Sequence, residues 1–136
     1  MPKRKSVISL NPSADAFTTF VDELTPGIHD VRGEWVSIDI GDYAHAILGD
    51  QDKEMRIRWI KETLQNPEEI RTSHLKSKPD RENYINRIYE DDQDATGTPF
   101  VVGVRRRPGK LDFRTAVIPT DAYLRNLRKG KLLWRP

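Results

Sequence analysis

The sequence predicts an α+β domain in which N-terminal helices pack on an antiparallel sheet of about four strands. Most segments with apolar residues at helical spacing lie before Gln65, and short runs rich in β-branched and aromatic residues follow. Helices followed by strands in meander order are typical of this class. The 136 residues suffice for one domain with one core and are too few for two ordinary domains.

The first part of the chain is predicted to be less regular than the rest. Residues 1–33 show weak periodicity and are interpreted as an N-terminal extension, whereas residues 34–136 are predicted to form the single α+β domain. Within the extension, Ser13–Leu24 carries an apolar face and ends before a Pro-Gly pair. This pattern predicts one short helix.

The next part of the chain predicts a strand, two helices and an extended run. Glu34–Ile40 alternates apolar and polar residues, which indicates a half-buried strand. Asp42 is a candidate cap for a short helix at Tyr43–Leu48. The clearest helical pattern is Asp52–Gln65, with apolar residues on one face and charged residues on the other. Pro67 ends it, and an extended run follows.

The stretch from residue 99 to residue 119 predicts the centre of the sheet. Two short β-branched runs, Phe100–Val104 and Leu111–Ile118, flank the basic turn Arg105–Lys110. Runs of this length bounded by Pro and Gly are typical of adjacent antiparallel strands in a hairpin. The second run also carries polar residues inside its apolar pattern, where a sheet presents functional groups.

The segments on either side of this hairpin predict three further elements. Glu82–Glu90 alternates Tyr, Ile and Arg, which indicates a strand that leads through an acidic linker into the hairpin. Thr120 is a candidate cap for a helix at Asp121–Arg128, and Gly130 would stop that helix. Lys131–Trp134 predicts one last short strand.

The composition excludes several kinds of site. The absence of Cys excludes disulfides, thiolate zinc sites and a Cys nucleophile. The three His residues lie far apart in sequence, and the acidic run Asp91–Asp94 lacks the glycine and spacing of an EF-hand. No stretch approaches the length of a membrane span, and no apolar segment follows the basic N-terminus. We therefore expect a cytoplasmic protein with no metal, no cofactor and no membrane partner.

The net charge of +2 conceals an asymmetry along the chain. From residue 97 to residue 136, ten Lys or Arg residues stand against two Asp residues, a balance of +8, so the first 96 residues sum to −6. A basic end on an otherwise acidic chain is typical of a polyanion-binding surface. A basic surface that is merely solvated is the alternative.

The middle and the end of the chain resemble a known group of small nucleases. The most distinctive segment is the helix-to-strand junction Trp59–Ile70, which reads I-x-E-T-L-x-x-P-x-x-I from Ile60 onward. Four shorter segments add to the resemblance: a Tyr/Arg strand at Tyr84–Tyr89, the run Phe100–Val104, Arg114–Ala116 and the closing Lys131–Trp134. Together they are similar to the barnase/EndoU/colicin/RelE-like (BECR-fold) ribonucleases, especially the phage- and toxin-associated members. The likeness extends over residues 45–134.

The resemblance implies a fold, an activity and a set of site residues. It implies helices on a four-stranded antiparallel sheet, metal-independent cleavage of tRNA or other structured RNA, and a protein inhibitor or antitoxin as a partner. The helix histidine of the family falls on His45, and its first-strand basic residue falls on Arg71. Its second-strand residues fall on Arg87 and Tyr89, and its T-A threonine falls on Thr115.

RNA cleavage without a metal needs a base for the 2′-hydroxyl, an acid for the leaving oxygen and cations for the phosphate. The sequence offers His45 and His74 as titrating groups, and Arg side chains as planar phosphate donors. We predict a catalytic set of His45, Arg71, Arg87 and Thr115, and a substrate-binding set of His74, Tyr89, Arg105, Arg106, Arg107 and Arg114.

Each of these residues also has a structural interpretation. In this interpretation, His45 is an ordinary packed or surface histidine of an amphipathic helix, and Arg71 and Arg87 pair with nearby Glu residues. Two further functions stay open on the same evidence. One is a catalytically silent RNA- or protein-binding module on the same fold. The other is a phage or mobile-element accessory protein that binds a host protein through its N-terminal helix and its acidic segments.

Overall fold

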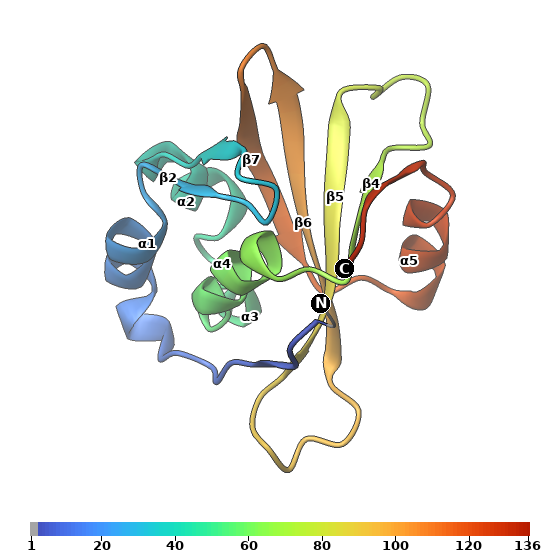
Figure 1. Cartoon of the computed structure of the whole chain (residues 1–136). Coiled ribbons are helices and arrows are strands. Elements are labelled where there is room, and N and C mark those ends of the chain that lie inside the picture. Colours follow the sequence, from blue (N-terminus) through green and yellow to red (C-terminus); the bar gives the residue numbers. More distant parts are fainter. Residues whose placement is uncertain (1–2) are drawn as a thin grey trace.

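The computed structural model describes residues 3–136, which form one mixed sheet of eight strands and five α-helices (Figure 1). The strands are β1 (Ser6–Val7), β2 (Gly27–His29), β3 (Trp35–Ser37), β4 (Glu69–Thr72), β5 (Arg81–Tyr89), β6 (Thr98–Arg107), β7 (Lys110–Val117) and β8 (Leu132–Trp134). The helices are α1 (Ala16–Leu24), α2 (Ile40–Ala46), α3 (Gln51–Glu54), α4 (Ile57–Gln65) and α5 (Asp121–Leu127), with the 3-10 turn η1 (Ser13–Asp15) before α1.

The three long strands β5, β6 and β7 form the antiparallel centre of the sheet. Their register places Asn83 opposite Gly103 and Gly103 opposite Thr115. The predicted hairpin is confirmed, and so is the predicted strand before it. The register between β6 and β7 shifts next to Gly103, so Arg114 and Thr115 lie at a bulge.

The expected antiparallel sheet of about four strands covered by N-terminal helices is wrong. The strand order is β2-β3-β7-β6-β5-β4-β8, with β1 beside β5, and the pairs β1–β5 and β3–β7 are parallel. The strand expected at Glu34–Ile40 is present as the shorter β3, whereas β1 and β2 have only two and three residues, too few for a recognisable alternation. Strands that pair in parallel also lie far apart in sequence, so no turn sequence between them indicates the pairing.

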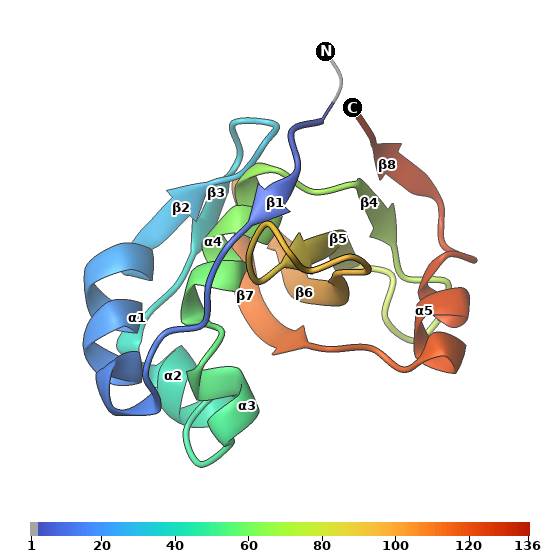
Figure 2. The same ribbon diagram turned by 90° about the horizontal axis from the view of Figure 1, so that it is seen from below.

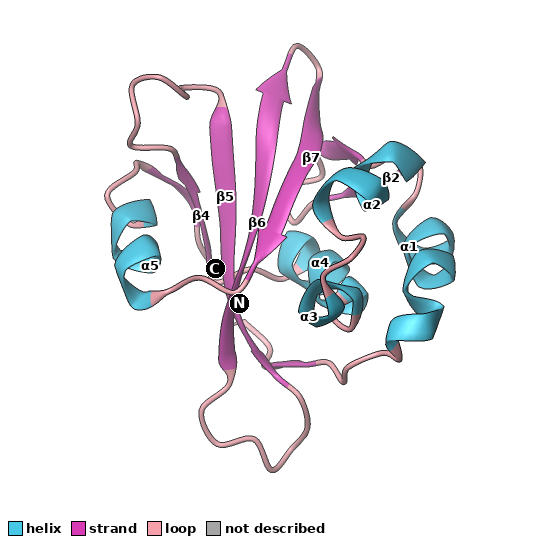
Figure 3. Cartoon of the chain, turned by 180° about the vertical axis from the view of Figure 1, so that it is seen from behind, coloured by secondary structure: helices cyan, strands magenta, loops and turns pink. Residues whose placement is uncertain are grey.

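Helices cover both faces of the sheet (Figures 2 and 3). Helices α1 to α4 lie on one side, where Phe20 and Trp59 are fully buried against Phe113 and Phe100 of the sheet. On the other side, Leu127 of α5 packs on a smaller apolar cluster at the sheet centre. Of the residues that the structure describes, no helix has both the length and the apolar character needed to cross a bilayer.

The N-terminal segment contributes to the same core. The predicted helix is confirmed as α1, which buries Ala16, Phe20 and Leu24 and begins after the 3-10 turn that holds Ser13. Strand β1 aligns Ser6 with Ile88 of β5. Residues 6–7 are therefore held against the C-terminal end of β5.

The single helix expected at Asp52–Gln65 is divided into α3 and α4. The Asn11 side chain fills the break: its amide nitrogen donates to Glu54 O at 2.7 Å, and its oxygen accepts from Ile57 N at 3.2 Å. The Asn11 backbone N–H donates to Met55 O at 2.9 Å. A residue far away in sequence thus satisfies the polar groups that a helix break exposes, which local periodicity could not indicate.

Candidate functional site

A pocket of about 220 Å³ lies on the sheet face that α5 covers. Its floor is a row of three residues across the central strands: Asn83 of β5, Gly103 of β6 and Thr115 of β7. One wall is the β4–β5 loop, and the other is α5. The pocket therefore combines three stretches of the chain: residues 73–83, 103–104 and 114–127.

Gly103 makes room for the polar side chains beside it. A Cβ atom at this position would lie 2.7 Å from Thr115 Oγ1 and 3.4 Å from Asn83 Oδ1. Asn83 is only 9% exposed, and its side-chain amide has no hydrogen-bond partner among residues 3–136. Because Asn83 lines the pocket, its amide offers donor and acceptor capacity to a ligand there.

The charged residues around this floor are all basic. Lys78, Arg81, Arg114 and His74 line the pocket, and no carboxylate of the described residues does so. The Nε atom of Arg81 is buried without a hydrogen-bond partner, and its contact with Asp80 Oδ1 is long, at 3.8 Å. We call this site the cationic pocket: Lys78, Arg81, Arg114 and His74 around the Asn83–Gly103–Thr115 floor.

The basic turn after β6, by contrast, is paired with acidic side chains. Arg105 Nε donates to Asp80 Oδ2 at 2.6 Å, and Arg107 Nε donates to Asp112 Oδ2 at 2.5 Å. The hydrogen bond from Arg105 holds the pKa of the Asp80 carboxyl below its usual range. The positive charge of this turn is thus largely compensated within the chain.

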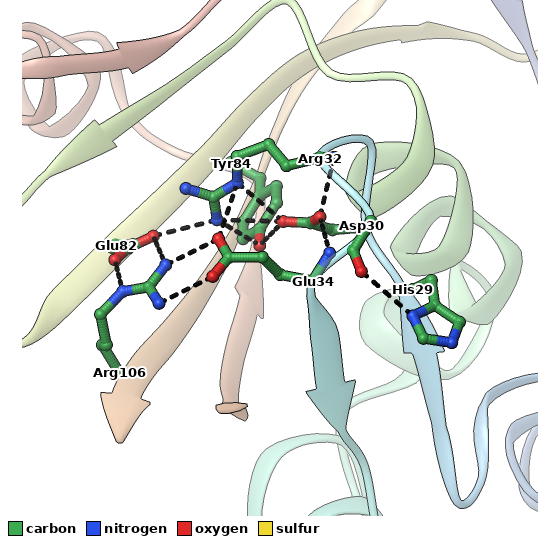
Figure 4. A network of polar contacts seen from close by, with 8 residues as sticks. His29, Asp30, Arg32, Glu34, Glu82, Tyr84 and Arg106 are labelled. Carbon is green, nitrogen blue, oxygen red and sulfur yellow. Dashed lines mark hydrogen bonds and ion pairs between the residues drawn. The ribbon is translucent and has the colours of Figure 1, made fainter. Parts of the chain in front are cut away.

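Arg106 belongs to a larger network (Figure 4). Its guanidinium donates to both oxygens of Glu34, at 2.9 and 2.8 Å, and also binds Glu82. The hydrogen bonds from Arg106 lower the pKa of Glu34 below its ordinary value. Because these residues lie on different strands or loops, the pairs join the β2–β3 turn to β5 and β6.

The other half of the network surrounds Tyr84. Arg32 donates to Asp30 Oδ2 at 3.0 Å, to Glu82 Oε1 at 3.0 Å and to Tyr84 Oη at 3.1 Å. The Tyr84 hydroxyl donates to Asp30 Oδ2 at 2.6 Å. Burial, followed by the bond to Asp30, raises the pKa of Tyr84 well above its ordinary value. The network fixes the end of β5 that adjoins the cationic pocket.

Three of the residues predicted for the site line this pocket: Thr115 from the catalytic set, and His74 and Arg114 from the substrate-binding set. His45 does not: it is exposed on α2, in the helical layer on the other face of the sheet. Its ring forms no hydrogen bond to another described residue. The structure therefore does not place the two candidate titrating histidines in one site.

The remaining predicted residues lie elsewhere. Arg71 binds Glu69 at 2.5 Å and donates to the backbone oxygens of Arg128 and Gly130, so it anchors the segment between α5 and β8. Arg87 lies at the other end of β5, where it donates to Thr96 O at 2.9 Å. Tyr89 follows it there, with Lys5 Nζ 4.2 Å from its ring centre.

Comparison with protein families shows to which family the chain belongs. The model of the family described as phage-Barnase-EndoU-ColicinE5/D-RelE like nuclease2 matches residues 14–135. The chain belongs to this family. It is thus a nuclease of the BECR type, and the resemblance inferred from the motifs is confirmed. Comparison with curated proteins and with solved structures found no match.

In this BECR-type nuclease, several residues of the cationic pocket escaped the sequence analysis. The missed residues are Lys78, Arg81, Asn83, Tyr123 and Asn126. Strand alternation could have found two of them, because Arg81 and Asn83 share the β5 face with Arg87. The spacing of Tyr123 and Asn126 places them on one side of α5. Only the strand register and the packing of α5 and of the β4–β5 loop on the sheet show that these residues meet Thr115.

The cationic pocket has the chemistry for a phosphodiester of a nucleic acid. Unpaired guanidinium groups bind phosphate oxygens through two parallel hydrogen bonds. The amide of Asn83 and the hydroxyl of Thr115 add neutral donors at the floor. His74 supplies a side chain of the type that exchanges protons near neutral pH. Among residues 3–136, no group of three or more His, Cys, Asp or Glu side chains has the geometry of a metal site.

Proposed function

We propose that this nuclease is an endoribonuclease that cleaves RNA by attack of the 2′-hydroxyl, without a metal ion, in the cationic pocket. One observation carries the proposal: three cations line a pocket that no carboxylate of the described residues enters, over a buried amide without a partner. In the rest of the chain, basic side chains such as Arg105, Arg106 and Arg107 have acidic partners. An anionic substrate is the partner that the pocket still needs.

Arg81 and Arg114 bind the scissile phosphate in this proposal. They approach from β5 and β7, on either side of the Gly103 floor. The buried Nε of Arg81 gains an acceptor when a phosphate oxygen enters, which removes the cost of an unsatisfied donor. Asn83 and Thr115 donate to the non-bridging oxygens as negative charge develops on them.

His74 serves as the base. It takes the proton of the 2′-hydroxyl as the 2′-oxygen bonds to phosphorus, and the bond from phosphorus to the 5′-oxygen breaks. The leaving oxygen takes a proton from solvent. The products carry a 2′,3′-cyclic phosphate and a 5′-hydroxyl. Free tRNA and other structured RNAs are the substrates that we propose to test first.

The test compares two exposed histidines. The wild type, His74→Ala and the matched control His45→Ala are each incubated with total tRNA in EDTA, and the products are separated on a denaturing gel. We expect discrete fragments with cyclic phosphate ends from the wild type and from His45→Ala. His74→Ala should cleave at least about 100-fold more slowly, because general acid–base catalysis contributes about 10²–10⁴-fold.

Three results would overturn the proposal in different ways. Loss of cleavage in His45→Ala with activity kept in His74→Ala would move the site to α2. Cleavage of an all-2′-deoxy strand at the same rate would exclude attack by the 2′-hydroxyl. Salt-sensitive RNA binding without any product, from a folded wild type, would favour the catalytically silent binding module.

A further inference from the structure

The cationic pocket also has an apolar part that a phosphate does not explain. Leu75 of the β4–β5 loop and Tyr123 of α5 both line the pocket, and they are 47% and 43% exposed. Single exposed apolar side chains are common on protein surfaces, but apolar side chains that line the same groove mark ligand-binding sites. Their position beside the cations indicates a ligand with both an anionic and an apolar, flat part.

Helix α5 adds a polar group next to this apolar part. Tyr123 and Asn126 are three residues apart, so they share one side of the helix, and both line the pocket. Neither the Tyr123 hydroxyl nor the Asn126 amide is hydrogen-bonded to another residue between positions 3 and 136. An aromatic face beside a free amide matches a nucleobase, which stacks through its faces and exchanges hydrogen bonds along its edge.

We infer that Leu75, Tyr123 and Asn126 form a nucleobase subsite that takes one unpaired base of the RNA. The inference rests on the proposed function, because it names the form of the RNA that the same pocket accepts. Phosphate binding at the Gly103 floor brings the attached nucleoside between the loop and α5. A base in a duplex is stacked and paired, so it cannot lie against Tyr123. The enzyme therefore acts on single-stranded segments and loops.

Binding and cleavage are measured together. The binding probe is a short fluorescent RNA with 2′-O-methyl riboses, which block attack, presented as a single strand, annealed to its complement, or with one nucleotide made abasic. The variants are Tyr123→Ala and Tyr123→Phe, with Leu133→Ala as an exposed control on β8. Circular dichroism verifies that each variant is folded, and Leu75→Ala tests the subsite independently from the loop side.

The wild type should bind the single strand at least about 10-fold more tightly than the duplex, since stacking on an aromatic side chain contributes about that much per base. Tyr123→Ala should lose about 10-fold in affinity, while Tyr123→Phe and Leu133→Ala bind as the wild type does. An abasic nucleotide at the bound position should weaken the wild type and leave Tyr123→Ala unaffected. With cleavable RNA, Tyr123→Ala should raise KM much more than it lowers kcat.

Equal affinity for single strand and duplex, together with unchanged binding by Tyr123→Ala and Leu75→Ala, would overturn the subsite. If the wild type still cleaves RNA in that case, the proposed function stands and the subsite alone fails. If the wild type neither binds nor cleaves RNA in any form, the proposed function fails and the subsite fails with it.

Discussion

At the scale of single residues, Gly103 lets the polar side chains of the pocket floor lie close to the backbone of β6. Its backbone does not need glycine, because its φ angle is not positive, and it sits inside the central strand β6. In a strand interior, glycine costs about 0.5–1 kcal/mol relative to alanine. The close approach of Thr115 Oγ1 to the Cβ position is a physical reason to keep glycine there.

Gly103→Ala should therefore impair activity more than stability. The added methyl group would meet Thr115 Oγ1 at 2.7 Å and force that hydroxyl to turn away from the floor. We expect kcat to fall by about 10-fold or more, as is usual when one donor at a developing charge is lost, and the free energy of unfolding to change by less than about 1 kcal/mol.

Steady-state RNA cleavage and urea unfolding of the same preparation separate the two effects. Thr115→Ala and the double variant complete a mutant cycle, in which the second substitution should add little to the first. Full activity in Gly103→Ala would show that the hydroxyl position is unimportant. Loss of the folded state would show instead that Gly103 is needed for packing.

At the scale of elements, the break between α3 and α4 depends on one side chain from another part of the chain. Asn11 is 2% exposed and bonds to groups on both sides of the break. Asn11→Ala leaves the Ile57 N–H without its side-chain acceptor, and an unsatisfied buried group costs about 1–3 kcal/mol. We expect a loss of roughly 2 kcal/mol in the free energy of unfolding.

Asn126→Ala is the matched control for this prediction. Asn126 is exposed, and its amide has no partner among the described residues, so its removal should change stability by less than about 0.5 kcal/mol. Urea unfolding followed by Trp fluorescence compares the two variants. Equal stability of Asn11→Ala and Asn126→Ala would mean that solvent satisfies the break as well as Asn11 does.

At the scale of the whole molecule, the local elements could be predicted better than the site. The hairpin β6–β7, strand β5 and helices α1 and α5 all follow from alternation, helical spacing and turn residues near each other in sequence. The cap of α5 also follows, since Thr120 accepts from Tyr123 N as predicted. The parallel pairings of β1 with β5 and of β3 with β7 could not be predicted, because the partners lie far apart in sequence.

The candidate site depends on these distant relations. Arg114 and His74 could be chosen by chemistry and Thr115 through the family resemblance. Their meeting with Arg81 and Asn83 depends on strand register and on where α5 packs. The distribution of charge along the sequence also overstated how basic the C-terminal part is in the folded protein. The excess at the basic end is partly cancelled in three dimensions, since Glu34 from the acidic part pairs with Arg106. Affinity for RNA should therefore come from the cationic pocket more than from the turn.

The N-terminal segment links stability of the whole domain to pH through Glu62. This carboxylate is 7% exposed; it accepts from Arg4 Nη2 at 2.7 Å, from Ser6 Oγ at 2.6 Å and from Asn66 Nδ2 at 2.9 Å. Burial alone would raise the pKa of Glu62, but these hydrogen bonds outweigh burial and lower the pKa below its ordinary value.

A lowered folded-state pKa means that the unfolded chain binds a proton first as the pH falls. The stabilisation by Glu62 is therefore complete above the unfolded pKa, about 4.3 for Glu, and is lost as the pH falls through the folded value. Glu62→Gln should cost about 1–3 kcal/mol at pH 7, as expected for hydrogen bonds to a charged group, and should flatten the decline of stability between about pH 5 and pH 3. Urea unfolding across this range measures both effects, with exposed Glu90→Gln as the control. An acid profile of Glu62→Gln parallel to that of the wild type would show that other carboxylates control the acid stability of the domain.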